Sequence, residues 1–213
     1  MKVKKFIFNP FQENTYLVYD EQTKEALVID CGCYSQEEKE ELLDFIQQNN
    51  LTIKYVLNTH LHMDHVFGNR FLYKQFGVKP QAHKNDIGLL ERMQEQSLAF
   101  GVPINEEEQP LGNYIDENDT LILGESPIQF IHVPGHSQGS LCVYFKKENW
   151  LFSGDVLFLR CIGRTDLPGG NFSQLTEGIR QKLFILPEET KVFAGHGFDT
   201  SIGYEKINNP FLL

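Results

Sequence analysis

The sequence is poor in cysteine and tryptophan and has no long apolar run. Its four cysteines, Cys31, Cys33, Cys142 and Cys161, are spread over 213 residues without the spacing of a disulfide framework, which indicates a reducing compartment. No apolar run approaches the length of a membrane span, and the apolar part of the N-terminal segment is far too short for a signal peptide. We therefore expect a cytoplasmic protein that does not enter a membrane.

Basic residues are also scarce relative to acidic ones. The chain has 19 Lys and Arg against 29 Asp and Glu, a net charge of −10. This balance excludes a broad nucleic-acid or anionic-membrane surface, although a local basic pocket for a small anion stays possible. With 41% hydrophobic residues and no linker or low-complexity segment, residues 1–213 are predicted to form one domain. The oligomeric state is not indicated.

One short segment, by contrast, is dense in metal-ligand side chains. The sequence THLHMDH at residues 59–65 combines three imidazoles with a carboxylate, which suit Zn²⁺, Fe²⁺ or Mn²⁺. Residues 53–57 predict a buried strand, and residues two apart in an extended backbone point the same way, so His60 and His62 can bind one ion. A turn into a helix start would carry Asp64 and His65 to a neighbouring position. The alternative, a solvated polar loop, would leave four adjacent ligand-type side chains idle.

Three further candidate ligands follow predicted strands. His136 follows a Pro-Gly turn after residues 128–132, and His196 lies between two glycines after residues 191–194. Asp155 follows residues 150–153, and its two oxygens can bridge two ions, although a turn aspartate is the alternative. Asp30 ends the predicted strand 25–30, either orienting a metal-bound histidine or serving as a plain turn residue.

Other chemistry-bearing residues are predicted to be structural. His83 follows a short strand, and His132 lies within one, so we expect both outside the site. Cys31 and Cys33 are interpreted as small buried apolar side chains rather than a metal pair. The acidic run at 106–108 is expected to be a solvated loop.

The hydrophobic pattern alternates strands with helices. Ser35 and Glu38 form a capping box before a helix that ends near residue 49, and helices are also expected at 69–76, 86–100 and 173–186, the last two capped by Asp86 and Ser173. A strand, helix and strand between residues 25 and 57 imply a right-handed crossover that puts the histidine segment at the carboxyl end of a strand. Both halves of the chain repeat this arrangement, which predicts two sheets packed face to face with helices outside.

The order and spacing of the motifs resemble the metallo-β-lactamase superfamily. The resemblance runs from residue 14 to residue 210 and implies an αββα four-layer sandwich of the α+β class, with two mixed sheets inside. Within the superfamily, residues 154–168 and 195–211 resemble the glyoxalase II (hydroxyacylglutathione hydrolase) group, especially its short bacterial members. The resemblance implies two zinc ions, with iron or manganese as alternatives. The implied ligands are His60, His62 and His136 for one ion, Asp64, His65 and His196 for the other, and Asp155 for both.

The implied reaction is hydrolysis of a thioester such as S-lactoylglutathione by a metal-bridging hydroxide, with Asp64 orienting the nucleophile. A thioester suits the lack of an obvious general acid, because a thiolate leaves without protonation. Arg164 is the candidate contact for a carboxylate of glutathione or another thiol carrier, with a surface salt bridge as the alternative. Lys206 and Asn209 are further candidate substrate contacts.

Two other functions stay open. Residues 163–166 also resemble the persulfide dioxygenases of the superfamily, which imply a single iron at His60, His136 and Asp155. A metal-binding domain without turnover is the third interpretation. A β-lactamase is not expected, because no export signal is seen.

Overall fold

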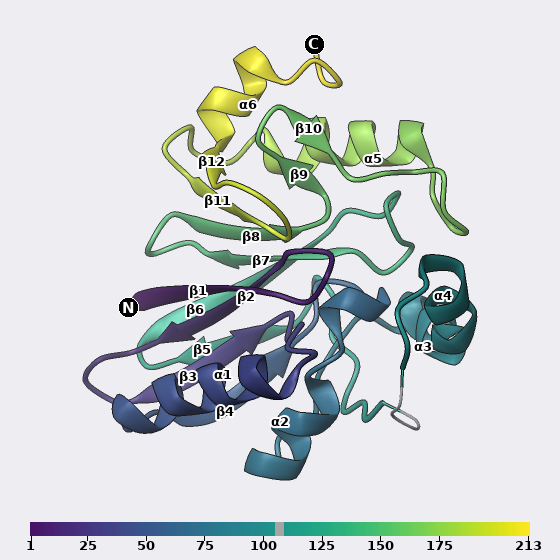
Figure 1. The fold of residues 1–213 in the computed structure, drawn as a ribbon. Coiled ribbons are helices and arrows are strands. Elements are labelled where there is room, and N and C mark those ends of the chain that lie inside the picture. The colour runs from purple at the N-terminus through teal and green to yellow at the C-terminus, as the bar shows by residue number, and fades with distance from the viewer. Residues whose placement is uncertain (105–108) are drawn as a thin grey trace.

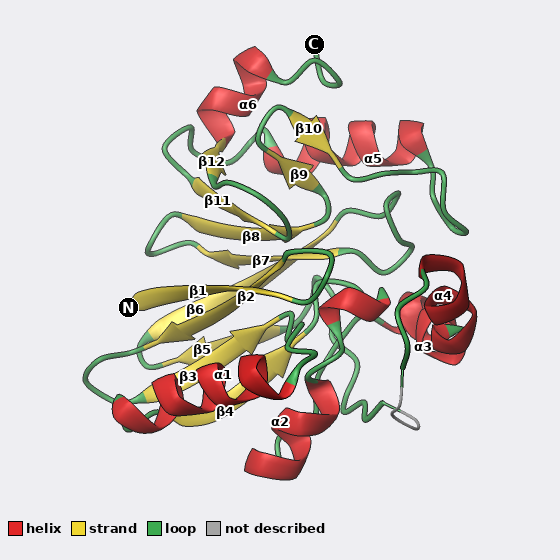
Figure 2. Ribbon diagram, viewed as in Figure 1, coloured by secondary structure: helices red, strands yellow, loops and turns green. Residues whose placement is uncertain are grey.

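The computed structural model describes residues 1–104 and 109–213, so the acidic run at 106–108 lies outside the described residues. Two mixed sheets stand face to face (Figures 1 and 2). The first has the order β1-β2-β3-β4, with only β3 and β4 parallel. Its strands are β1 (Lys2–Phe8), β2 (Glu13–Tyr19), β3 (Glu25–Ile29) and β4 (Thr52–Leu57).

The second sheet has the order β12-β11-β8-β7-β6-β5, and its only parallel pair among the described strands is β8 with β11. These strands are β5 (Thr120–Leu123), β6 (Ser126–His132), β7 (Leu141–Phe145), β8 (Trp150–Gly154), β11 (Lys191–Ala194) and β12 (Thr200–Ser201). A separate pair, β9 (Leu157–Phe158) and β10 (Cys161–Ile162), follows β8.

Alternation along the strands builds the layers. In β2, Tyr16 and Val18 join the core between the sheets, where they meet Phe152 of β8. Leu17, between them in sequence, faces the opposite way and packs with Leu42 of α1 (Gln36–Gln48). Since successive strand side chains point to opposite faces, one strand can serve two cores.

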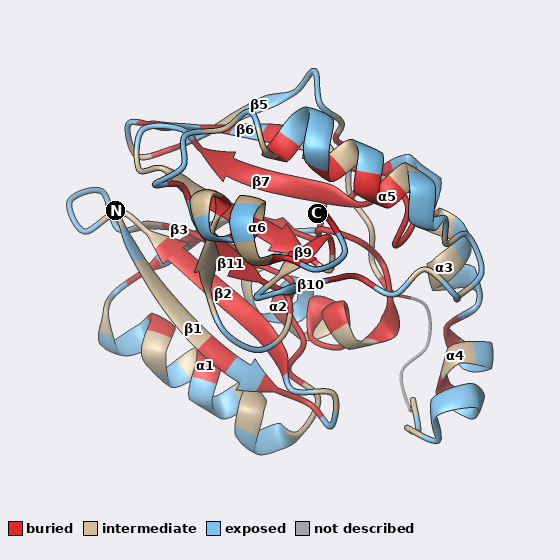
Figure 3. Cartoon of the chain, turned by 90° about the horizontal axis from the view of Figure 1, so that it is seen from above, coloured by how far each residue is buried: buried red, intermediate tan, exposed pale blue. Residues whose placement is uncertain are grey.

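Helices cover both outer faces. α1 and α2 (Asn69–Phe76) lie on the first sheet, whereas α5 (Phe172–Gly178) and α6 (Ile202–Asn208) lie on the second (Figure 1). Figure 3 shows the buried strands inside and the exposed helix faces outside. The predicted αββα arrangement is therefore confirmed. Among the described residues, no helix combines the length and apolar character needed to cross a bilayer.

The predicted helix over 86–100 is divided in two. α3 (Ile87–Glu91) and α4 (Met93–Phe100) meet at Arg92, and both pack at one edge of the molecule over the loop after β4. Asp86 precedes α3 but makes no side-chain cap, because its carboxylate bonds elsewhere. The helix expected from Ser173 begins at Phe172, with Asn171 as its cap, and continues through a π-helical turn at Ile179–Leu183. The capping box of Ser35 with Glu38 is confirmed.

The first hairpin is joined to the loop after β11. The Asn14 side chain donates to the carbonyls of Ala194 and Gly197, at 2.9 and 3.1 Å, and the Asn14 backbone N–H donates to Gly195 at 2.7 Å. The Tyr16 hydroxyl also donates to the Ala194 carbonyl. These bonds connect segments about 180 residues apart in sequence, and they fix the loop that carries His196.

Candidate metal centre

The candidate ligands lie at the ends of four strands. The loop after β4 carries His60 and His62 and then a single 3₁₀ turn, Met63–His65. The loops after β6, β8 and β11 carry the remaining three. The structure brings together all seven residues predicted as ligands: His60, His62, Asp64, His65, His136, Asp155 and His196.

The first group consists of three buried histidines. Nε2 of His136 lies 2.9 Å from Nδ1 of His62 and 3.2 Å from Nε2 of His60. Nδ1 of His136 is 2.9 Å from the Arg164 carbonyl oxygen, to which only an N–H can donate, so Nε2 of His136 carries the lone pair. This lone pair faces nitrogens of both other rings, so a cation placed between them could bind all three. The group therefore fits a divalent ion bound by imidazoles.

The tautomer of His60 is fixed by a chain of hydrogen bonds. Thr59 donates its hydroxyl to Asp30 Oδ2 at 2.6 Å, which leaves the Thr59 oxygen to accept from Nδ1 of His60 at 3.1 Å. Nε2 of His60 therefore presents its lone pair to the group. Such outer contacts orient a ligand before the ion arrives.

The second group mixes a carboxylate with two histidines. Asp64 Oδ2 lies 3.2 Å from Nε2 of His196 and 3.6 Å from Nε2 of His65. Nδ1 of His196 is 3.1 Å from the Phe11 carbonyl oxygen, and Nδ1 of His65 is 3.1 Å from Asp30 Oδ2. Both rings thus turn Nε2 inward, and the three ligand atoms lie within 4.8 Å of one another.

Asp155 stands between the two groups. Its Oδ2 is 3.6 Å from Nε2 of both His136 and His196, and its Oδ1 is 3.5 Å from Nε2 of His65. Oδ1 is buried without a hydrogen-bond partner among the described residues, a state that is costly unless a cation binds there. A Cβ on Gly195 would lie 2.2 Å from this oxygen, so the glycine makes room for the carboxylate.

The two groups differ in charge. Burial, reinforced by the neighbouring histidines, lowers the pKa of His60 well below its usual value and that of His62 to about 3. Burial also opposes the charge on His65, but Asp64 and Asp155 outweigh it and raise the pKa of His65 well above the ordinary value.

The remaining members of the second group follow the same pattern. Burial disfavours a charged His196, yet the contacts with Asp64 and Asp155 raise its pKa. Burial likewise disfavours the carboxylate of Asp155, but His65 and His196 hold its pKa well below the usual range. The second group therefore holds ion pairs, whereas His60 and His62 of the first group are neutral rings.

Asp30 lies directly behind the histidine segment. It accepts from the Thr59 backbone N–H at 2.7 Å and from the Thr59 hydroxyl, and it faces Nδ1 of His65. Its backbone adopts a left-handed conformation with φ of 51°. These contacts match the orienting role predicted for Asp30 rather than a plain turn.

Asp86 plays a comparable part that the sequence did not reveal. Its buried carboxylate accepts from the Leu61 backbone N–H at 3.3 Å, the Ser137 hydroxyl at 2.7 Å and the Gly139 backbone N–H at 2.6 Å. It thereby joins the loop of His60 and His62 to the loop of His136. The expected capping role was wrong because the side chain turns inward to these donors.

Glu13 is a second buried carboxylate missed in the sequence. It is fully buried at the end of β2, pairs in a bridge with His196, and accepts from the Thr15 hydroxyl at 2.8 Å. Burial raises its pKa well above the usual value. Nothing in the spacing of the sequence marks Glu13, because only the docking of β2 against the loop after β11 brings it here.

The predicted substrate contacts have separate outcomes. Arg164 lines a cavity of about 340 Å³ together with His62, Asp64, His136, Asp155 and His196. Its guanidinium forms a two-pronged ion pair with Asp166, with both N–O distances 2.8 Å.

Lys206 instead pairs with Glu188 at 3.6 Å and does not line this cavity. The contact predicted at Asn209 is wrong, because Asn209 is fully buried and its amide donates to the Cys161 carbonyl and to Glu205.

Residues expected outside the centre lie outside it. His83 and His132 stack with ring centroids 4.2 Å apart, and Nδ1 of His83 accepts from the Asn85 backbone N–H. Cys31 and Cys33 are fully buried in the core beneath α1, where their predicted role as small apolar side chains is confirmed.

The fold and the seven converging side chains indicate one class of protein, and comparison with known proteins identifies that class. The family model described as "Metallo-beta-lactamase superfamily" matches residues 8–196. The chain belongs to this superfamily.

Individual relatives show which members of the superfamily the chain resembles. The chain is 37% identical to hydroxyacylglutathione hydrolase GloC of Haemophilus influenzae, over 95% of this chain and 93% of that one. It also resembles the solved structure of the BLEG-1 B3 metallo-β-lactamase, with 36% identity, a TM-score of 0.90 and 99% of both chains covered. TTHA1623 in a di-iron-bound form shares 34% identity and a TM-score of 0.86, over 99% of this chain and 100% of that one.

Proposed function

We propose that the protein is a metal-dependent hydrolase that cleaves a thioester such as S-lactoylglutathione into a carboxylic acid and a free thiol. The main support is the position of Asp155 within 3.6 Å of histidines from both ligand groups, as a shared ligand of two ions requires. The likeness to a hydroxyacylglutathione hydrolase along nearly the whole chain adds to it. Zinc is the proposed metal, with iron or manganese as alternatives, since a similar structure holds two irons.

Two bound divalent ions would lower the pKa of a water molecule and stabilise negative charge on the thioester carbonyl oxygen. His60, His62 and His136 would hold one ion, Asp64, His65 and His196 the other, and Asp155 both. We assign the orientation of the attacking water to Asp64, which lines the cavity with His136 and Asp155. The C–S bond then breaks, and the thiolate leaves without a proton donor because its conjugate acid has a pKa of about 8.5.

Arg164 is the proposed contact for a carboxylate of the thiol carrier. It lies in the same cavity as the ligands, and its loop is held to the centre by the 2.9 Å bond between its carbonyl and His136. To bind a substrate carboxylate, the guanidinium would have to release Asp166 or contact both carboxylates. The ion pair with Asp166 would therefore lower the affinity of Arg164 for the substrate. The proposal includes a reducing, cytoplasmic setting, because all four cysteines are free. The sulfurs of Cys31 and Cys33 lie 3.5 Å apart and form no disulfide.

The test combines metal analysis with three assays on the purified protein. We expect two metal ions per chain and release of free thiol from S-lactoylglutathione or another acyl thioester. A single iron with oxygen uptake on glutathione persulfide would replace the proposal with a dioxygenase. Hydrolysis of a β-lactam such as nitrocefin without thioester cleavage would assign the activity named for BLEG-1. Metal binding without turnover in any assay would leave a binding domain.

A further inference from the structure

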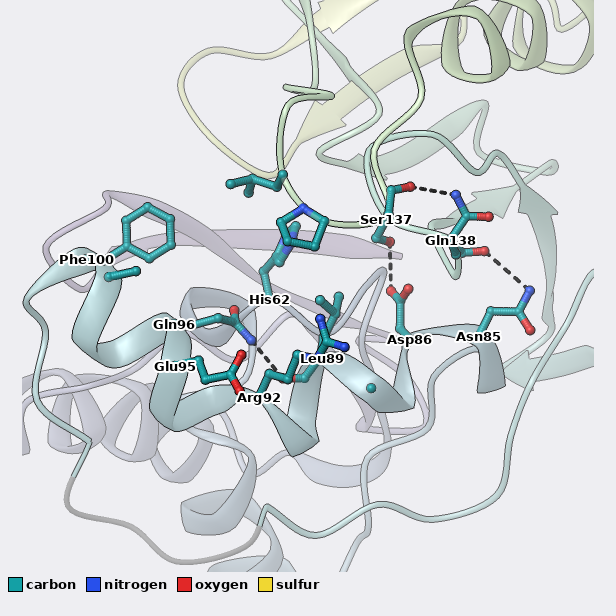
Figure 4. A pocket seen from close by; sticks show the side chains of 15 residues that line it. His62, Asn85, Asp86, Leu89, Arg92, Glu95, Gln96, Phe100, Ser137 and Gln138 are labelled. Atoms are coloured by element: carbon teal, nitrogen blue, oxygen red, sulfur yellow. Dashed lines mark hydrogen bonds between the residues drawn. The ribbon is translucent and has the colours of Figure 1, made fainter.

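A second cavity opens beside the metal centre. Its volume is about 420 Å³, within the range of small-molecule sites, and it shares His62, Gln96, Phe100 and Leu167 with the cavity that holds the ligands. Figure 4 shows it between His62 on one side and the helical segment from Asn85 to Phe100 on the other. The two cavities thus adjoin at these four residues and form one cleft.

The polar side chains in this second cavity are already engaged. Gln96 accepts from the Met63 backbone N–H at 3.1 Å. It also donates to the Leu89 carbonyl at 2.7 Å, as Figure 4 shows. Asp86 is occupied by Leu61, Ser137 and Gly139, as described above. Gln138 donates to the Gly169 carbonyl at 2.6 Å. These three side chains already have partners within the protein, so they offer a ligand few unused donors or acceptors.

The remaining wall is mostly apolar. Leu89, Ala99, Phe100, Leu167 and Pro168 line it, while Arg92 and Glu95 are charged and exposed at its edge. Such a surface favours an apolar group, because each methylene it buries is removed from water. This apolar wall therefore differs from the Arg164 side of the cleft, which Asp64 and Asp155 also line.

We infer that this cavity binds the acyl part of the substrate, and that the acyl group is an apolar chain of about four to eight carbons rather than a small hydroxyacyl group. The inference rests on the proposed thioester hydrolysis. With the carbonyl carbon over the centre, the acyl chain would lie between His62 and α4, and the thiol carrier would lie towards Arg164. A lactoyl group, with one hydroxyl and one methyl, would leave most of the cavity unused.

Gly88 offers a clean way to close the cavity. It lines the wall on α3, is exposed, and a Cβ built on it meets nothing within 4 Å. Gly88→Phe therefore adds a ring to the cavity without disturbing the packing, and it contacts no metal ligand. Glu91→Phe is the matched control, because Glu91 is exposed on the same helix and does not line the cavity.

The first measurement is kcat/KM for acetyl, butanoyl, hexanoyl and lactoyl thioesters of one thiol. We expect the wild type to gain about three- to fourfold per buried methylene up to hexanoyl. Gly88→Phe should lose at least about tenfold on hexanoyl and change acetyl by less than about twofold, while Glu91→Phe should match the wild type. Equal rates along the series, a preference for lactoyl over hexanoyl, or an equal loss on every substrate in Gly88→Phe would overturn the inference.

The second measurement does not depend on turnover. Hexanamide, whose head group is neutral, is titrated into the protein while the methyl NMR signals of Leu89 and Ala99 are followed, with acetamide as the small control. Shifts with hexanamide that Gly88→Phe abolishes and Glu91→Phe retains would support the site. No shift would reject it. If no thioester is cleaved, the proposed function fails, and the titration alone then decides whether the cavity binds apolar chains.

Discussion

The two candidate ligand groups both bring metal-binding atoms close together, but they differ in the charges of the side chains that do so. The first group gathers three imidazoles, with the Nε2 lone pairs of His60 and His136 facing each other, and burial keeps His60 and His62 uncharged. The second sets Asp64 against His65 and His196, whose pKa values are raised, so without an ion its charges compensate one another. Without metal, His60 and His62 of the first group are uncharged. In the second group, protonated His65 and His196 balance the charge of the carboxylates.

This difference predicts how each group takes up metal. An ion entering the first group meets His60 and His62, whose pKa values are lowered, so protons compete only weakly for these two ligands. An ion entering the second group must displace protons from His65 and His196, so its affinity falls as the pH is lowered through their raised pKa values. Asp155, which touches both, links the two equilibria.

The largest expected effect comes from removing the carboxylate of Asp155, which faces both groups. Asp155→Ala should lower the metal content at both groups and reduce turnover by more than about a thousandfold, because one carboxylate faces histidines of both. This exceeds the roughly 10–100-fold effect of outer contacts. Metal analysis after gel filtration, with the exposed Asp44→Ala on α1 as control, measures it. Loss of only one ion would contradict the shared role.

Removing one histidine from each group should reveal how metal binding by the other group depends on pH. His62→Ala and His196→Ala should each retain one ion, but the ion left in His62→Ala occupies the charged group and should be lost more readily on acidification. Dialysis at pH 8, 7, 6 and 5 followed by metal analysis gives the two profiles. Identical profiles would show that the groups do not differ in their proton competition.

The carboxylates behind the ligands provide a milder version of the same comparison. Asp30 faces His65 of the second group directly and reaches His60 of the first group only through the Thr59 hydroxyl, whereas Asp86 supports the loops of His60, His62 and His136. We expect Asp30→Asn and Asp86→Asn each to weaken metal binding by about 10–100-fold, the first mainly at the second group and the second at the first group. Competition with a chromophoric chelator measures both affinities, and equal weakening of both groups in either variant would refute this division.

The smallest effect is on the stability of the metal-free protein. Because the folded pKa of His62 is about 3, below its unfolded value, His62 destabilises the fold as the pH falls below about 6.5; at pH 5.5 the cost is about 1 kcal/mol. His196 has a raised pKa, so it stabilises the fold below about 6.5 and loses that effect as the pH rises through its folded pKa.

His62→Gln should therefore reduce the acid loss of stability, whereas His196→Gln should increase it. Urea unfolding of chelator-treated protein between pH 8 and 5.5 tests both, with Asp44→Ala again as the reference. The same pH dependence in the two variants would contradict the opposite charge states assigned to the two groups.

The sequence predicted the layers, and which side chains would converge, better than the residues that support those side chains. Strand alternation and the capping box of Ser35 are local signals, so they were readable, and ligand-type residues after strands were expected to meet at one sheet edge. The role of Asp86 depends on donors at Leu61, Ser137 and Gly139, which are brought together only by packing. The same holds for Glu13.

The errors have similar causes. The break at Arg92 within the expected helix 86–100 follows from packing α3 and α4 over the loop after β4, which overrides a continuous helical pattern. Asn209 was assigned to a substrate from a family pattern, yet it bonds to Cys161 and Glu205 in the interior. A pattern can locate a polar residue near a site without revealing whether it faces the solvent or the core.

The bonds between Asn14 and the loop of Ala194 to Gly197 have a consequence for biosynthesis. On the ribosome, the histidine segment at 59–65 and the loop of His136 emerge before β11 is made, so the group of His196 can be completed only after the other three histidines are already available. Translation order would thus favour loading the imidazole group first. Capture of the last ion would then report that both ends of the polypeptide have met.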